Sequence, residues 1–151
     1  MKTERHWLDG LRIYLGFTIA LHLVWEVAQL PLYTIWSTGS PQEIAFTVLH
    51  CTAGDLMIVS LTLGLALVCF GGPAWPHERF LPVMLATLAI GIGYTVYSEW
   101  QNTVVRKAWA YSEFMPTLPP FGTGLSPLLQ WIVVPMFGFA AIWLRRRRLD
   151  N

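Results

Sequence analysis

The sequence is poor in charged residues and in cysteine. Asp, Glu, Lys and Arg make up 13% of the 151 residues, whereas an average soluble domain carries about 25%. The two cysteines, Cys51 and Cys69, fall in one hydrophobic run, and on a helix they would lie about 27 Å apart. That separation is far beyond the reach of a disulfide. The sequence therefore excludes an ordinary soluble domain, and it excludes a disulfide framework or a two-cysteine redox motif within one chain.

Apolar and aromatic residues are abundant instead. Hydrophobic residues make up 54% of the chain, which includes eight Trp and eight Phe. A membrane-spanning helix needs about 20 mainly apolar residues. Four runs meet that length, and we expect spans at about residues 11–30, 43–70, 80–100 and 126–144. The chain is thus predicted to be one transmembrane domain over residues 1–151, an all-α four-helix bundle in which no cleavable signal peptide is expected.

Local signals mark the ends of these helices. Ser40-Pro41-Gln42-Glu43 has the pattern of an N-cap, a proline in the first turn and a capping-box glutamate, which predicts the start of the second helix. Gly71-Gly72-Pro73 predicts its end. The longest segment outside the spans, residues 101–124, is expected to form a short interfacial helix near residues 104–114 and then an ordered loop.

The Lys and Arg residues predict the orientation. With four spans both termini share one side of the membrane, and eight of the ten basic residues fall on that side. They are Lys2, Arg5, Arg12, Arg79 and Arg145–Arg148. The positive-inside rule therefore places both termini in the cytoplasm, with the protein in the inner membrane. We expect Arg145–Arg148 to contact anionic lipids, and we expect no nucleic-acid partner.

A polar stripe lies within the first span. Thr18, His22, Glu26 and Gln29 follow one another at spacings of four, four and three, which puts them on one side of a helix. An unpaired charge at membrane depth costs about 2.5–3.5 kcal/mol on insertion scales. Another part of the fold must therefore face this stripe and satisfy it.

The other intramembrane polar residues predict a pocket. His50 matches His22 in depth, Asp55 lies deeper, and Glu99 lies at the outer end of the third span. We therefore expect a polar pocket that opens to the outer side, covered by residues 101–124. His50 and Asp55 lie about 140° apart around their helix, so a pocket touches both only if the second helix is central in the bundle.

Acid–base chemistry on a lipid-like or isoprenoid-like substrate is the leading interpretation of this pocket, because buried carboxyl and imidazole groups can exchange protons. The candidate catalytic residues are His22, Glu26, His50, Asp55 and Glu99. Aromatic and basic residues nearby could contact the substrate. They are Trp25, Tyr94, Tyr97, Trp100, Arg106, Lys107 and Tyr111. The alternative is that the aromatic residues form the usual interfacial belt and that Arg106 and Lys107 form a solvated face.

Two cofactor interpretations of the same histidines are also possible from the sequence. His22 and Glu26, one turn apart, could bind a divalent metal together with His50. His22 and His50 could instead be axial ligands of a b-type haem. In a purely structural alternative, a hydrogen bond between Glu26 and His22 only holds helices together.

The sequence alone leaves three classes of protein open. The first is an enzyme or a binding protein for a lipid-like molecule, and the second is a proton or solute transport subunit. The third is a structural or assembly subunit of a larger membrane complex or oligomer. A conductor needs polar residues that continue to the cytoplasmic side, and the apolar residues 59–68 argue against one. An assembly subunit should expose polar groups on an outer face. Gly64, Gly91 and Gly93 are expected to allow close helix packing.

Overall fold

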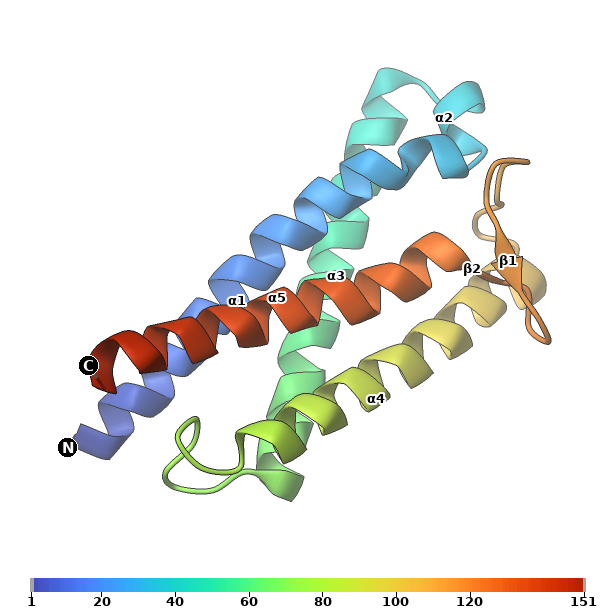
Figure 1. Cartoon of the computed structure of the whole chain (residues 1–151). Helices are drawn as coiled ribbons and strands as arrows, with labels where there is room; N and C mark the ends of the chain where they lie inside the picture. Colours follow the sequence, from blue (N-terminus) through green and yellow to red (C-terminus); the bar gives the residue numbers. More distant parts are fainter. Residues whose placement is uncertain (1, 151) are drawn as a thin grey trace.

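The computed structural model describes residues 2–150, with side chains described for residues 7–148. Its long helices are α1 (Lys2–Gln29), α3 (Pro41–Phe70), α4 (Phe80–Trp100) and α5 (Leu125–Asp150) (Figure 1). The segments long and apolar enough to cross a membrane are Trp7–Leu32, Pro41–Phe70, Phe80–Val105 and Leu125–Arg148. The predicted all-α bundle of four membrane-spanning helices is thereby confirmed.

The start and the end of α3 follow the local sequence signals. The hydroxyl of Ser40 accepts a hydrogen bond from the Glu43 amide at 3.3 Å, and the Glu43 carboxylate accepts one from the Ser40 amide at 2.8 Å. This is a complete capping box, with Pro41 in the first turn. The helix ends before Gly71, whose amide donates to the Leu67 carbonyl at 2.8 Å. The short helices η1 (Leu30–Leu32) and α2 (Ile35–Thr38) connect α1 to α3.

Each long helix packs against two others. Helix α1 contacts α3 and α5, and α4 contacts the same two helices. Both chain ends lie at one end of the bundle (Figure 1), which is called the terminal end below. The opposite end, where α1 leads into α2 and α4 leads toward α5, is called the cavity end.

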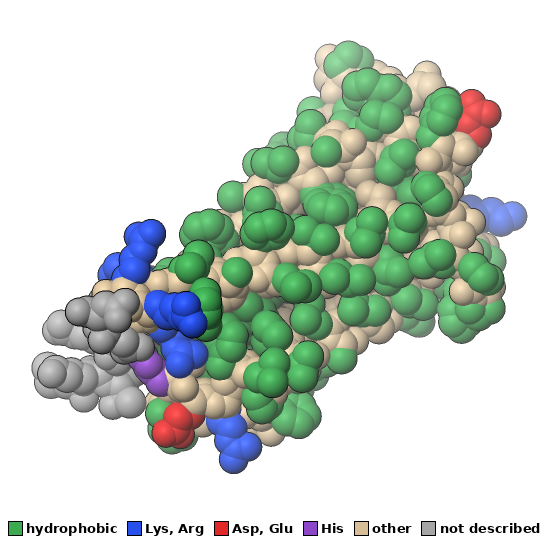
Figure 2. Space-filling view, in the orientation of Figure 1, with side chains coloured by type: hydrophobic (Ala, Val, Ile, Leu, Met, Phe, Trp, Pro, Cys, Tyr) green, Lys and Arg blue, Asp and Glu red, His purple; other side chains and the backbone are tan. Residues whose placement is uncertain are grey.

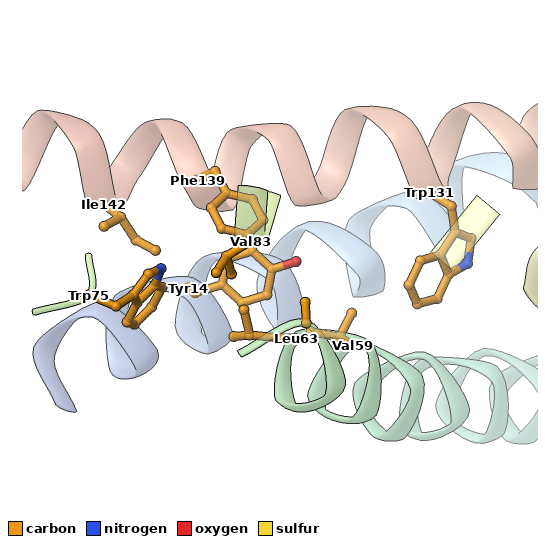
Figure 3. Packing of buried hydrophobic residues seen from close by; sticks show 9 residues of the cluster. Tyr14, Val59, Leu63, Trp75, Val83, Trp131, Phe139 and Ile142 are labelled. Atoms are coloured by element: carbon orange, nitrogen blue, oxygen red, sulfur yellow. The ribbon is translucent and has the colours of Figure 1, made fainter. Parts of the chain in front are cut away.

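The half of the bundle at the terminal end is an apolar core (Figure 3). Tyr14 of α1 packs on Phe139 of α5 with ring centroids 4.8 Å apart. Leu63 of α3 and Val83 of α4 complete the contact, and all four side chains are buried. Trp75, in the connection between α3 and α4, is fully buried and closes this end.

Two of the long helices approach closely where a glycine allows it. A Cβ atom on Gly91 would lie 2.7 Å from the Trp131 ring, so this glycine lets α4 pack on α5. The predicted role of glycine in close packing is confirmed at this position. A Cβ atom on Gly64 or Gly93 would meet no atom within 4 Å, so the prediction was wrong for those two residues.

The outer surface has the character expected of a protein in lipid. Large apolar side chains cover the long sides of the bundle, and most of the visible Lys and Arg residues gather at the terminal end (Figure 2). Val24, Leu61 and Val68, for example, are 64%, 64% and 86% exposed. Apolar exposure on this scale is unfavourable in water and is satisfied by acyl chains.

The segment between α4 and α5 contains an ordered loop, whereas the interfacial helix expected near residues 104–114 is not formed. Helix α4 continues through one π-helical turn, η2 (Gln101–Val105), and the chain then turns at Lys107, which has a φ of 54°. Residues 106–124, called the strap below, run across the cavity end. The strap includes an antiparallel hairpin of β1 (Thr117–Leu118) and β2 (Thr123–Gly124).

Backbone hydrogen bonds to a distant segment replace the expected helical ones in the strap. The Thr34 amide donates to the Ala110 carbonyl at 3.0 Å, and the Ser112 amide donates to the Leu32 carbonyl at 2.9 Å. Tyr33 and Tyr111 form an isolated antiparallel bridge between the same segments. The strap is therefore fixed to the connection between α1 and α2.

Candidate functional site

The polar stripe of α1 faces the interior of the bundle, as predicted. Thr18, His22, Glu26 and Gln29 are 0%, 1%, 9% and 6% exposed, whereas Val27 between them is 54% exposed. The partners of the stripe come from α5 and α3. They form a buried polar cluster that joins three helices.

Gln130 of α5 is the centre of this cluster. Its Nε2 atom donates to Glu26 Oε1 at 3.0 Å and to Asp55 Oδ2 at 3.1 Å, and it lies 2.9 Å from His22 Nδ1. The Nδ1 atom of His22 also lies 3.3 Å from Asp55 Oδ2. An amide nitrogen carries only two hydrogens, so it cannot donate to all three neighbours. With its two hydrogens donated to Glu26 and Asp55, the amide has none left for His22, so the contact with His22 Nδ1 is not a third hydrogen bond from Gln130.

A second layer of hydrogen bonds holds Glu26 in place. Gln29 donates from Nε2 to Glu26 Oε1 at 2.8 Å, and Ser126 donates to Gln29 Oε1 at 2.9 Å. The indole of Trp25 donates to the Ser126 hydroxyl at 3.1 Å. Trp25, predicted as a substrate contact, is thus used to tie α1 to the start of α5.

A cavity of about 690 Å³ lies beside the cluster, within the range of about 300–1,000 Å³ that is usual for small-molecule sites. Three carboxyl side chains line it from three different helices: Glu26 from α1, Asp55 from α3 and Glu99 from α4. The rest of the wall is mainly apolar and aromatic. Among the described residues that line the cavity there is no Lys or Arg.

The cavity opens sideways between α3 and α4. These helices share the apolar core through Leu63 and Val83 and diverge toward the cavity end (Figure 1). In the divergent part the cavity is lined by Phe46 and His50 of α3 and by Tyr94 of α4, and all three are exposed. The His50 and Phe46 rings stack with centroids 5.6 Å apart. The surface around these exposed residues is apolar, as expected of a side that faces lipid.

The strap covers the cavity at the cavity end of the bundle. Tyr111 donates a hydrogen bond to Glu99 Oε2, and the Tyr111 oxygen accepts one from the Gly124 amide at 2.9 Å. Burial raises the pKa of the Tyr111 hydroxyl, and the Glu99 carboxyl raises it further. Tyr111 therefore stays protonated at neutral pH and remains a donor to Glu99.

Tyr33 adds a second protonated hydroxyl at this end. Its ring lies 5.6 Å from the ring of Tyr111, centroid to centroid, and it lines the cavity. Burial raises the pKa of Tyr33, and Glu99, Tyr111 and Glu26 raise it further. Tyr33 therefore presents a neutral phenol to the cavity in addition to the carboxyl groups of the wall.

The predicted site residues fall into two groups. Glu26, His50, Asp55, Glu99 and Tyr94 line the cavity. The second group does not line it, and consists of His22, Trp25, Tyr97, Trp100, Arg106, Lys107 and Tyr111. Within that group His22 and Tyr111 hold lining residues in place, through Asp55 and Glu99. His50 and Asp55 of α3 both line the cavity, although α3 packs against two long helices like each of the others and is not central in the bundle.

The histidines predicted as ligands occupy different surroundings. His22 is buried behind the cavity wall, against Gln130 and Asp55, whereas His50 is exposed at the opening. Among residues 7–148, no three His, Cys, Asp or Glu side chains converge as a group that could hold a metal. His22, Glu26 and His50 are therefore not assembled as a metal site among the described residues. The pairing of His22 and His50 as haem ligands stays a prediction.

Gln130 and Ser126 are the site residues that the sequence interpretation missed. They are the polar side chains of the otherwise apolar stretch of residues 125–144, and they are four residues apart. That spacing places them on one helix face, which is the same kind of signal that identified the stripe of α1.

Comparison of the chain with models of protein families, with curated proteins and with solved structures found no match.

Proposed function

We propose that this protein binds an amphipathic, lipid-like small molecule from the bilayer and exchanges protons with it. The observation that carries the proposal is the presence of Glu26, Asp55 and Glu99, from three helices, on the wall of one mainly apolar cavity. The apolar body of such a molecule can pack on the apolar wall, and its polar head can contact the carboxyl groups.

The sideways opening supports a ligand that comes from the membrane. Exposed apolar side chains surround the opening between α3 and α4, so a molecule dissolved in acyl chains enters without crossing water. The strap covers the outer end of the same cavity through Tyr111 and Tyr33. A water-soluble substrate would have to displace this strap.

The buried cluster supports proton exchange. Gln130 holds Glu26 and Asp55 together while His22 contacts Asp55 from behind. Two carboxyl groups and an imidazole in hydrogen-bond contact can pass a proton among themselves, and Glu26 and Asp55 can pass it to a bound molecule. In this proposal Glu26 and Asp55 are the acid–base groups, and His22 and Gln130 position them.

The apolar core argues against a conductor. Tyr14, Leu63 and Phe139 are buried between the cavity and the terminal end. A proton or ion path through the bundle would have to cross this packed half, where a charge has no partner. The inward direction of the α1 stripe likewise argues against a subunit whose polar residues pair with another protein.

The distribution of basic residues supports an inner-membrane location with both termini in the cytoplasm. Arg145–Arg148 lie in the last turns of α5, at the terminal end, and Arg106 and Lys107 directly follow η2, at the cavity end. Fusion of a fluorescent protein or of alkaline phosphatase to the C-terminus tests this orientation. Fluorescence without phosphatase activity is expected, and the opposite result would overturn it.

The function is tested by identifying small molecules that co-purify with the protein. Mass spectrometry of protein purified in a mild detergent should detect one lipid-like species in stoichiometric amount. The Asp55→Asn and Glu26→Gln variants should lose that species while keeping the thermal unfolding transition. A folded wild-type protein that neither carries nor takes up any lipid-like molecule would refute the proposal.

A further inference from the structure

We infer that the ligand of this cavity has a positively charged head, such as a protonated amine, on an apolar body. The inference rests on the proposed binding function and adds the charge of the ligand. It follows from four observations on the cavity wall, which concern the charges, the carboxyl group of Glu99, the aromatic faces and the opening.

The charged residues on the wall have one sign. Glu26, Asp55 and Glu99 line the cavity, and no described lining residue is Lys or Arg. Arg106 and Lys107 are exposed and do not line it. An anionic head, such as a phosphate or a fatty-acid carboxylate, would therefore meet like charge with no compensating cation, whereas a cationic head would supply the missing countercharge.

Glu99 brings a buried carboxyl group to the cavity wall. Its side chain is 7% exposed and lines the cavity, and Tyr111 donates to its Oε2 atom. The Trp109 indole also neighbours this carboxyl group and lines the cavity. Both neighbours are uncharged, so a cationic head would supply the charged partner that the described wall does not give to Glu99.

Aromatic side chains form much of the remaining wall. Tyr33, Trp109 and Trp131 line the cavity from three separate segments. The faces of such rings attract cations, and the attraction increases when the cation is desolvated. A wall of carboxyl groups and aromatic faces, without Lys or Arg among its described residues, therefore favours an ammonium group over a neutral or anionic one.

The opening between α3 and α4 fits the other part of such a ligand. Phe46 and Met57 of α3 and Tyr94 of α4 line the cavity and are exposed toward the surrounding lipid. An apolar body can stay at this opening while the charged head reaches Glu26, Asp55 or Glu99. The ligand class is therefore a lipophilic amine and not a soluble cation.

The test uses three probes with the same tail and different heads. Dodecylamine, dodecanol and dodecanoate are titrated into the full-length protein in phosphatidylcholine nanodiscs, and binding is followed by tryptophan fluorescence and by the unfolding temperature. Empty nanodiscs correct for partition into lipid. Wild-type protein is expected to bind dodecylamine most tightly and dodecanoate least tightly.

Matched variants assign the effect to the cavity. Glu26→Gln, Asp55→Asn and Glu99→Gln each remove one charge from a different helix, and loss of a charged hydrogen bond should weaken dodecylamine binding by about ten- to a hundredfold. Dodecanol binding should be unchanged. Glu113→Gln removes the same charge from an exposed residue that does not line the cavity, and it should leave both affinities unchanged.

Each result has a defined meaning. Equal affinity for dodecylamine and dodecanol, or a preference for dodecanoate, would overturn the charge of the ligand while the proposed binding function stands. The same holds if a neutral or anionic lipid co-purifies and is displaced by none of the probes. Absence of any bound or co-purifying lipid-like molecule would remove the binding function itself. The three substitutions lie on three different helices. If one variant does not fold, the other two still test the charge of the ligand.

Discussion

Gln130 of α5 and Glu26 of α1, which are 104 positions apart in the sequence, meet at 3.0 Å between Nε2 and Oε1. The same amide nitrogen reaches Asp55 of α3 at 3.1 Å. One uncharged side chain therefore satisfies carboxyl groups from two other helices. This arrangement keeps both carboxyl groups on the cavity wall without a neighbouring Lys or Arg.

Replacement of this amide should destabilise the bundle. In Gln130→Leu the carboxyl groups of Glu26 and Asp55 lose their shared donor, and we expect the free energy of unfolding to fall by about 1–3 kcal/mol. Gln42→Leu, at an exposed position near the start of α3, is the control and should change it little. The measurement is chemical unfolding in detergent followed by tryptophan fluorescence. Equal effects of the two substitutions would show that the amide is not a structural centre.

The strap should loosen when its tyrosine is changed. Tyr111→Phe removes the donor to Glu99 and the acceptor for the Gly124 amide. Hydrogen–deuterium exchange is expected to become faster at Gly124 and across the strap, while α1 and α3 stay unchanged. Tyr97→Phe, at an exposed residue that does not line the cavity, serves as the comparison. If exchange in the strap is the same in both variants, the Tyr111 hydroxyl does not hold it.

A methyl group at Gly91 should disturb the cavity wall. In Gly91→Ala the new Cβ atom would lie 2.7 Å from the Trp131 ring, so the ring or the helix must move. Overpacking of this kind costs about 1–3 kcal/mol, and the unfolding temperature should drop. Gly93→Ala meets no atom within 4 Å, and it should be neutral or stabilise the helix by about 1 kcal/mol. A similar loss in both variants would contradict this packing.

The negative charge of the wall should be measurable at a thiol. Cys51 lines the cavity and Cys69 does not. In a Cys69→Ser protein, the cationic reagent aminoethyl methanethiosulfonate should modify Cys51 faster than the anionic sulfonatoethyl reagent, with a rate ratio higher by about tenfold than that of a free thiol. The ratio should fall when Glu26→Gln is added. In the reciprocal Cys51→Ser protein, Cys69 should show no comparable preference, and an anionic preference at Cys51 would contradict the predicted potential.

The sequence predicted the local features of the site and not its partners. The spacing of Thr18, His22, Glu26 and Gln29 fixes which face of α1 is polar, because helix geometry is local. The register between α1 and α5 depends on contacts such as Gly138 against Tyr14 and Thr18. No single-helix pattern contains that register, so the meeting of Gln130 with Glu26 could not be predicted.

The strap shows the same limit more strongly. Its composition allowed a short interfacial helix, yet its backbone pairs with Leu32 and Thr34, about 80 positions earlier in the chain. The energy of these long-range hydrogen bonds is not visible in local propensity. In contrast, the capping box at Ser40 and Glu43 was predicted correctly because both of its partners lie within four residues.

Helix α3 packs on α4 at the apolar core and diverges from it toward the cavity end, so a tilt of α3 about the packed part moves its other end. Leu63 lies 22 residues from Pro41, at the other end of α3, which is about 33 Å at about 1.5 Å per residue. A tilt of about 5° about Leu63 would move that end by about 3 Å. The lateral opening beside Phe46 and His50 lies in the moving part. Bilayer thickness and lateral pressure act on helix tilt. They are therefore expected to act on the width of the entrance, because α3 would pivot at its packing around Leu63 and Val83.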